Sequence, residues 1–141
     1  MSPNLAAAHG QSGATLIFSG RPTEGVAALH TYMRLDPRDP NWAIRMQQMA
    51  IGHYFRHEYE AAIEAAKRAV WAYPQFPNTY RWLAAALGQV GQIEEAKRAL
   101  RKAIAVAPAS FDMYVRCRVP WHRPEDRAHM LDGLRKAGWP E

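Results

Sequence analysis

Apolar residues in the second half of the chain recur at spacings of three and four positions, with charged residues between them. Two such stripes lie between residues 77 and 107: Tyr80, Leu83, Ala84 and Leu87, and then Ala96, Ala99, Leu100 and Ala103. This spacing places the apolar side chains on one face of an α-helix. Gly88 and Gly91 interrupt the pattern and predict a turn. We therefore expect two helices joined by a turn.

Residues 41–73 show the same pattern. The inward-facing stripes are expected to be Met46, Met49, Ala50 and His53, and then Ala62, Ala65, Ala66 and Ala69. The turn between them is expected near His57, and Pro74 ends the second helix. Glu64 precedes Arg68 by four residues, the order in which such a pair stabilises a helix.

A constant shift along the sequence superimposes the two helix pairs. Pro74 lies 34 residues before Pro108, and Ala62 lies at the same distance before Ala96. Charge follows the same shift, because Glu60 aligns with Glu94. A repeat of this length is typical of a solenoid, in which each unit is one helical hairpin stacked on the next.

The flanking segments contain weaker copies. Before Pro37, Leu29 and Tyr32 keep the spacing of a second helix, although Gly10 and Gly13 make residues 4–19 a poor helix by propensity alone. After Pro108 a further hairpin begins, but a proline at position 120 prevents its first helix from continuing.

A complete set of helix signals follows from Pro124. A proline opens this segment, two acidic residues follow it, and basic residues come before a terminal glycine. We expect this helix to cap the open end of the stack.

The chain is thus predicted to be one all-α domain over residues 1–141. The architecture is a short right-handed α-solenoid of about three helical hairpins plus a C-terminal capping helix. The expected units are a divergent repeat at 4–37, repeats at 41–76 and 77–108, and an aborted hairpin with the capping helix at 109–141.

Composition supports a helical protein. The chain has 141 residues, the size of one domain, and 48% of them are hydrophobic. Its single cysteine, Cys117, cannot form an internal disulfide. No signal peptide and no apolar run long enough for a membrane span are present. The predicted location is the cytoplasm, without membrane association.

The formal net charge of +5 is unevenly spread along the chain, and Lys97, Arg98, Arg101 and Lys102 lie close together in one predicted helix. Nucleic-acid binding is not expected, because no aromatic residues alternate with these cations and no known binding module is present. A solvated outer helix face explains the charge.

The two central helix pairs resemble tetratricopeptide repeats. Small residues occupy the positions at which that family places them, and Pro74 and Pro108 match its terminal proline. Ala66 and Leu100 stand where the family usually has an aromatic residue, and His53 and Leu87 stand where it usually has tyrosine. The resemblance implies the helical solenoid and a protein or peptide partner.

A closer resemblance concerns the stretch YEAAIEAAKRAVWAYPQFPNTYRWLAAALGQVGQIEEAKRAL and the ending RPEDRAHMLDGLRKAGWPE. Both are similar to the C-terminal repeat region of proteobacterial multidomain regulators. Those proteins join a class III adenylate cyclase domain or a winged-helix domain to tetratricopeptide repeats. The resemblance implies a regulatory module, but no cyclase metal-binding pair of aspartates is visible here, so catalysis is not implied.

Three groups of residues are candidate sites of chemistry. His53 and His57, with Glu58 beside them, could share a helical face and bind zinc, although no third ligand has a fixed position. Trp121, His122, Asp126 and His129 surround the expected capping helix but lack a recognisable nucleophile. Cys117 lies between two arginines, which would lower its pKa, or it is a small buried residue. We predict no catalytic residue, metal, cofactor or small-molecule substrate.

In the tetratricopeptide family, partners usually bind the concave face formed by the first helix of each pair. The corresponding positions here define a predicted groove: Gln47, Ile51, Tyr54, Asn78, Arg81, Trp82, Ala85 and Gln89. Its mixture of aromatic residues and one cation suits a peptide with apolar anchors. For Tyr54 and Trp82, ordinary packing between helices is the other interpretation.

The sequence therefore predicts a non-enzymatic interaction scaffold that binds a protein or peptide segment through this groove. Self-association into a homodimer, as part of a cyclase or transcriptional regulator, is one alternative. A metal-binding or enzymatic protein is the other.

Overall fold

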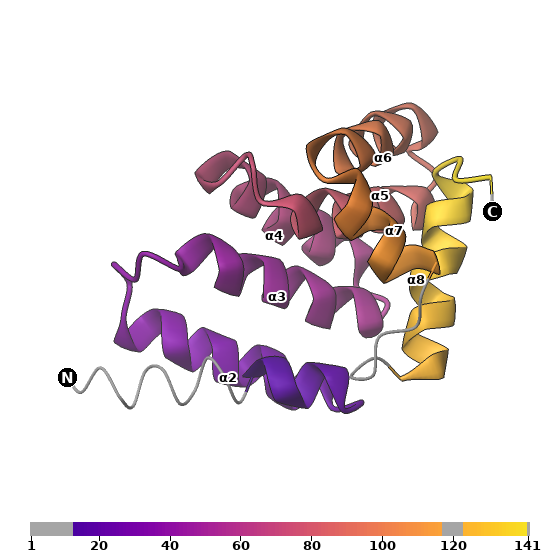
Figure 1. Cartoon of the computed structure of the whole chain (residues 1–141). Helices are drawn as coiled ribbons and strands as arrows, with labels where there is room; N and C mark the ends of the chain where they lie inside the picture. Colours follow the sequence, from indigo (N-terminus) through magenta and orange to yellow (C-terminus); the bar gives the residue numbers. More distant parts are fainter. Residues whose placement is uncertain (1–12, 117–122, 141) are drawn as a thin grey trace.

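The computed structural model describes residues 13–116 and 123–140. Within these ranges the regular elements are helices and no residue lies in a strand (Figure 1). The prediction of an all-α protein built as a short helical solenoid is confirmed. Among the helices in these ranges, none combines the length and apolar character that a membrane span requires.

The helices follow one another with short connections. Residues 13–18 are helical, and the remaining helices are α2 (Pro22–Leu35), α3 (Trp42–Phe55), α4 (Tyr59–Ala72), α5 (Pro77–Gln89), α6 (Ile93–Val106), α7 (Pro108–Arg116) and α8 (Pro124–Lys136). Figure 1 shows the hairpins stacked upon one another, with α8 running across one side of the stack. Pairs α3–α4 and α5–α6 lie within the segments 41–76 and 77–108.

Prolines begin several of these helices. Pro22, Pro77 and Pro124 each occupy the first turn, where a missing N–H costs nothing. The residue before a proline is restricted to extended backbone, and Phe76 accordingly has φ −76° and ψ 114°. A single proline therefore keeps the residue before it extended and also begins the next helix.

Each hairpin turn contains one residue with left-handed backbone. In the first and third hairpins this residue is a glycine, Gly20 (φ 89°) or Gly91 (φ 81°). In the second hairpin it is His57 (φ 61°), which lies one 34-residue period before Gly91. Because side chains beyond Cα are disfavoured in this region, His57 is a strained position.

The core is built largely from alanine. All members of the four predicted inward-facing stripes are buried except His53, which is half-buried. Ala66, Ala84 and Ala96 have no exposed surface, and their small side chains allow the helices to pack closely. Gly88 differs from its prediction, because α5 continues through it to Gln89.

The last helix does more than cover the final hairpin. Arg123, just before α8, packs against Gly20 in the first hairpin turn. Further along, His129 contacts α3 in the second hairpin, and Gly133 contacts α5 in the third. Helix α8 and the residue before it therefore contact three successive hairpins.

Candidate functional site

The predicted groove does not form an open surface. Six of its eight residues are buried: Gln47, Ile51, Tyr54, Arg81, Trp82 and Ala85. Asn78 and Gln89 are half-buried. Trp82 also contacts the ring of Tyr54, with ring centroids 5.6 Å apart, so both aromatic side chains belong to the packed interior.

A network of hydrogen bonds joins helix α8 to two of these residues, Tyr54 and Gln89. The Tyr54 hydroxyl donates to the backbone carbonyl of His129 over 2.5 Å. Gln89 Nε2 donates to the Tyr54 hydroxyl (3.2 Å) and to Asp132 Oδ2 (3.0 Å). Lys136 Nζ donates to Gln89 Oε1 over 2.9 Å. Two of the residues predicted to bind a partner, Tyr54 and Gln89, thus hold the chain's own last helix.

Two glycines allow α8 to approach α5 this closely. A Cβ atom on Gly133 would lie 2.6 Å from the carbonyl oxygen of Ala85 and would also meet the Tyr54 hydroxyl. A Cβ on Gly88 would meet the carbonyl oxygen of Gly133. Neither position accepts a side chain without movement of the helices. Partner binding by the predicted groove stays a prediction, and it would require α8 to move.

An aromatic and imidazole cluster joins α8 to the second hairpin turn. The Tyr59 hydroxyl lies 2.8 Å from His57 Nδ1 and 2.7 Å from His129 Nε2. The two imidazole rings stack with their centroids 4.4 Å apart. The ring of Tyr54 also stacks on that of His129, with centroids 4.3 Å apart. Burial, together with the neighbouring His57, lowers the pKa of His129 to about 4, so this imidazole is neutral at pH 7.

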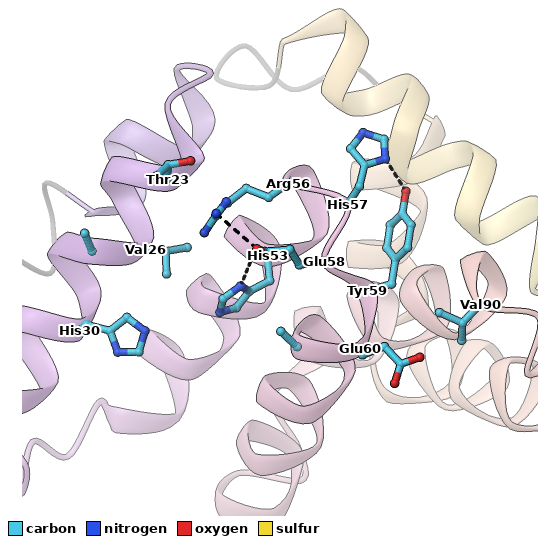
Figure 2. Close-up of a pocket in the computed structure, with 12 residues that line it drawn as sticks. Thr23, Val26, His30, His53, Arg56, His57, Glu58, Tyr59, Glu60 and Val90 are labelled. Carbon is cyan, nitrogen blue, oxygen red and sulfur yellow. Dashed lines mark hydrogen bonds and ion pairs between the residues drawn. The ribbon is translucent and has the colours of Figure 1, made fainter.

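His53 and His57, the two imidazoles considered for zinc, do not converge on one point. His53 Nδ1 lies 2.9 Å from Glu58 Oε1, whereas His57 is directed to Tyr59 (Figure 2). In the described ranges no group of three or more His, Cys, Asp or Glu side chains gathers as a metal site would need. Burial raises the pKa of Asp126. Cys117, Trp121 and His122 lie outside the described residues.

A pocket of about 860 Å³ lies between α2 and the start of α4 (Figure 2). Val26 and Ala27 of α2 and Ala61 of α4 supply apolar lining. On the polar side Glu58 accepts from Arg56 over 3.2 Å, and the exposed Glu60 lies on the rim.

Two more hollows continue along α4. The first, of about 160 Å³, is lined in part by His53 and Ala61, which also line the large pocket. The second, of about 540 Å³, shares Glu64 and Arg68 with the 160 Å³ hollow. We call this row of three hollows the α4 trough. It runs from the second hairpin turn to the end of α4.

The far end of the trough contains two tryptophans. Trp42, at the start of α3, is half-buried and lies under the guanidinium of Arg68, 5.4 Å from its ring centroid. Trp71 is 86% exposed. Both line the 540 Å³ hollow together with Ile63. The site is not among those predicted from the sequence. The outward position of Trp71 nevertheless follows from the helical spacing of the inward-facing alanines of α4.

Comparison with known proteins supports the fold. No protein-family model matches the chain, and no curated protein matches it. Among solved structures, the crystal structure of MamA, a protein with tetratricopeptide repeats, is similar with a TM-score of 0.69 and 21% sequence identity. The match covers 96% of this chain and 78% of the MamA chain. At this identity the likeness concerns the helical-repeat fold alone.

Proposed function

We propose that the chain is a non-enzymatic module that binds a protein segment along the α4 trough. Helical-repeat folds of this kind serve in general as protein interaction scaffolds and are typically not enzymes. The single observation that supports the trough is Trp71, a large aromatic side chain left 86% exposed beside an apolar hollow. Exposed apolar groups that gather at a hollow mark interaction sites more often than isolated ones do.

The chemistry of the trough suggests the kind of segment that fits. Trp42, Ile63 and Trp71 offer an apolar hollow for one aromatic or branched side chain. Carboxylates of Glu60 and Glu64 lie toward the start of α4, and cations lie toward its end. A short amphipathic helix would match this surface if it carried an apolar anchor, cations facing the start of α4 and carboxylates facing its end.

Selection of helical peptides from a displayed library against the folded protein tests the proposal. Selected peptides should bind the Trp71→Ala variant at least about tenfold more weakly, because truncation of a central aromatic anchor removes much of the binding energy. Their binding to Ile104→Ala, which alters an exposed apolar residue on α6, should be unchanged. Equal affinity for both variants would place the binding surface elsewhere.

The predicted groove is the second candidate, and one observation favours it. Part of the network that holds α8 over it consists of the exposed polar groups Asp132 and Lys136, so water competes for these bonds. If α8 leaves, a partner helix could take its place against Tyr54 and Ala85. Peptides of this type would bind more tightly to Gly133→Ala, which weakens the docking of α8, and would be unaffected by Trp71→Ala.

A regulatory role and a link to a cyclase or winged-helix domain remain part of the proposal. Their support is the similarity of the terminal segment 133–140 to multidomain regulators. Adenylate cyclase activity is not proposed for this chain. A cyclase or winged-helix domain in the same reading frame would support the regulatory assignment.

A further inference from the structure

We propose that the occupant of the α4 trough is a second copy of this chain, paired antiparallel through α4. This inference rests on the proposed function, because it uses the same surface, and it names the partner. Helix α4 carries an exposed stripe on its outer face. Its members, which we call the α4 stripe, are Glu60, Glu64, Lys67 and Trp71, and all four are exposed.

The spacing of the α4 stripe suits a helix pair. Successive members are four, three and four residues apart, the alternation by which one helix presents a continuous seam to another. Ile63 and Arg68 flank this seam. The face is therefore geometrically able to contact a second helix along about 17 Å, at 1.5 Å per residue.

The order of charge along the stripe is self-complementary. A two-fold axis across the middle of α4 brings Glu64 of one copy opposite Lys67 of the other, and the symmetry repeats this pair. The same register brings Glu60 opposite Trp71. A parallel arrangement would instead align each charge with its own kind, which is unfavourable.

The neighbouring hollows can receive the two tryptophans in this register. Glu60 lies on the rim of both the 860 Å³ pocket and the 540 Å³ hollow. Trp71 of the second copy therefore arrives at the mouth of the larger pocket, whose apolar lining includes Val26 and Ala61. Burial of two indoles, one from each copy, supplies the apolar anchors that charge pairs alone lack.

Existing contacts of the stripe are compatible with this pairing. Lys67 Nζ lies 2.7 Å from Glu95 Oε1 of α6, and an ammonium group has further donors for a second carboxylate. Among the described residues, no ion pair engages Glu60 or Glu64. Both carboxylates are therefore accessible to the other copy.

Sedimentation equilibrium of the full chain at physiological salt tests the inference through charge exchange. Wild type is expected to dimerise, whereas Glu64→Lys and Lys67→Glu should each dimerise at least about tenfold more weakly, since each places like charges opposite one another twice. An equimolar mixture of the two variants should form a heterodimer, because every pair is then complementary again. Trp71→Ala should also weaken the dimer, and circular dichroism should show all variants folded.

Three outcomes would overturn the inference. These are a wild type that stays monomeric at high micromolar concentration, single variants that dimerise like wild type, or a mixture that behaves as the sum of its parts. The peptide selection described above separates this failure from that of the proposed function. Peptides whose binding depends on Trp71 in a monomeric protein would retain the trough as a binding site and exclude the second copy as its occupant.

Discussion

At the scale of single residues, His57 is the clearest conflict between local preference and tertiary contact. The equivalent positions in the neighbouring hairpins are glycines, Gly20 and Gly91, and His57 adopts their left-handed backbone with φ 61°. Its ring stacks on His129 and contacts the Tyr59 hydroxyl. The side chain is thus positioned against α8 at the expense of backbone strain.

We expect His57→Gly to be more stable than His57→Ala by about 1 kcal/mol, because only glycine relieves the left-handed strain. Both substitutions remove the ring, so the difference between them isolates the backbone. Urea denaturation measures it. The matched control is His53, within helix α3, where the order should reverse because alanine is the better helix former. Equal stability of the two His57 variants would contradict the assignment of strain.

His129 should make the stability depend on pH. Its pKa falls from 6.5 to about 4 in the folded protein, so between these values the unfolded chain binds a proton that the folded chain does not. Stability is therefore fully present above about pH 6.5 and decreases as the pH falls toward 4. The pKa values of Glu58 and Asp132 are lowered from 4.5 and 3.8, so the stability that these carboxylates contribute is lost mainly below those values.

Urea denaturation at pH 7 and pH 5 should reveal this loss. After allowance for solvent screening around a half-buried ring, wild type should lose about 1 kcal/mol between the two values. His129→Gln, which cannot titrate, should show a smaller difference. A pH dependence of the same size in the variant would assign the effect to other groups.

At the scale of helices, the crossing of α5 and α8 depends on Gly88 and Gly133. Gly133→Ala should destabilise the protein by about 1–3 kcal/mol, because the new methyl group meets the Ala85 carbonyl oxygen and must displace α8. Thermal unfolding measures the change. Ala128→Ser, an exposed substitution on the same helix, should change stability little. If the two variants were equally stable, α8 would not be held by this crossing.

The helices themselves could be predicted from the sequence, because their stripes follow the helical period over whole segments. The position of α8 could not. Glycine is a poor helix former, and Gly88 interrupts the apolar pattern in the sequence. In the structure Gly88 and Gly133 instead allow a close approach of two helices that are distant in sequence. No local pattern indicates which distant surface α8 will cover. For Tyr54 and Trp82 the sequence therefore leaves both a groove and ordinary packing open, and in the structure both side chains are buried.

The α4 trough was missed for a related reason. Its hollows form between α2, α3 and α4, and a hollow depends on how far apart whole helices lie. Pattern analysis does locate the outward face of α4, and Trp71 on that face is a visible exception to its charged neighbours. An exposed tryptophan at a helical position that should be polar is a signal the sequence contains.

At the scale of the whole molecule, α8 changes how the stack should unfold. In a simple solenoid each hairpin contacts only its neighbours, so the ends open independently. Here Arg123, just before α8, packs against the turn at Gly20, and α8 itself contacts the cluster at His57 and the crossing at Gly88. It therefore links hairpins that are not adjacent and should increase cooperativity among α3, α5 and α8.

Native-state hydrogen exchange should resolve this difference along the stack. Helix α5 contacts α3, α4, α6, α7 and α8, whereas α2 lies at the edge of the stack, between α3 and the helical residues 13–18. We expect the amides of α2 to exchange through openings of lower free energy than those of α5. The amides of α3, α5 and α8 should share one higher value, since α8 joins them. A single value for all helices would mean that the first hairpin unfolds with the rest, and a separate low value for α8 would mean that it detaches alone, as binding to the predicted groove requires.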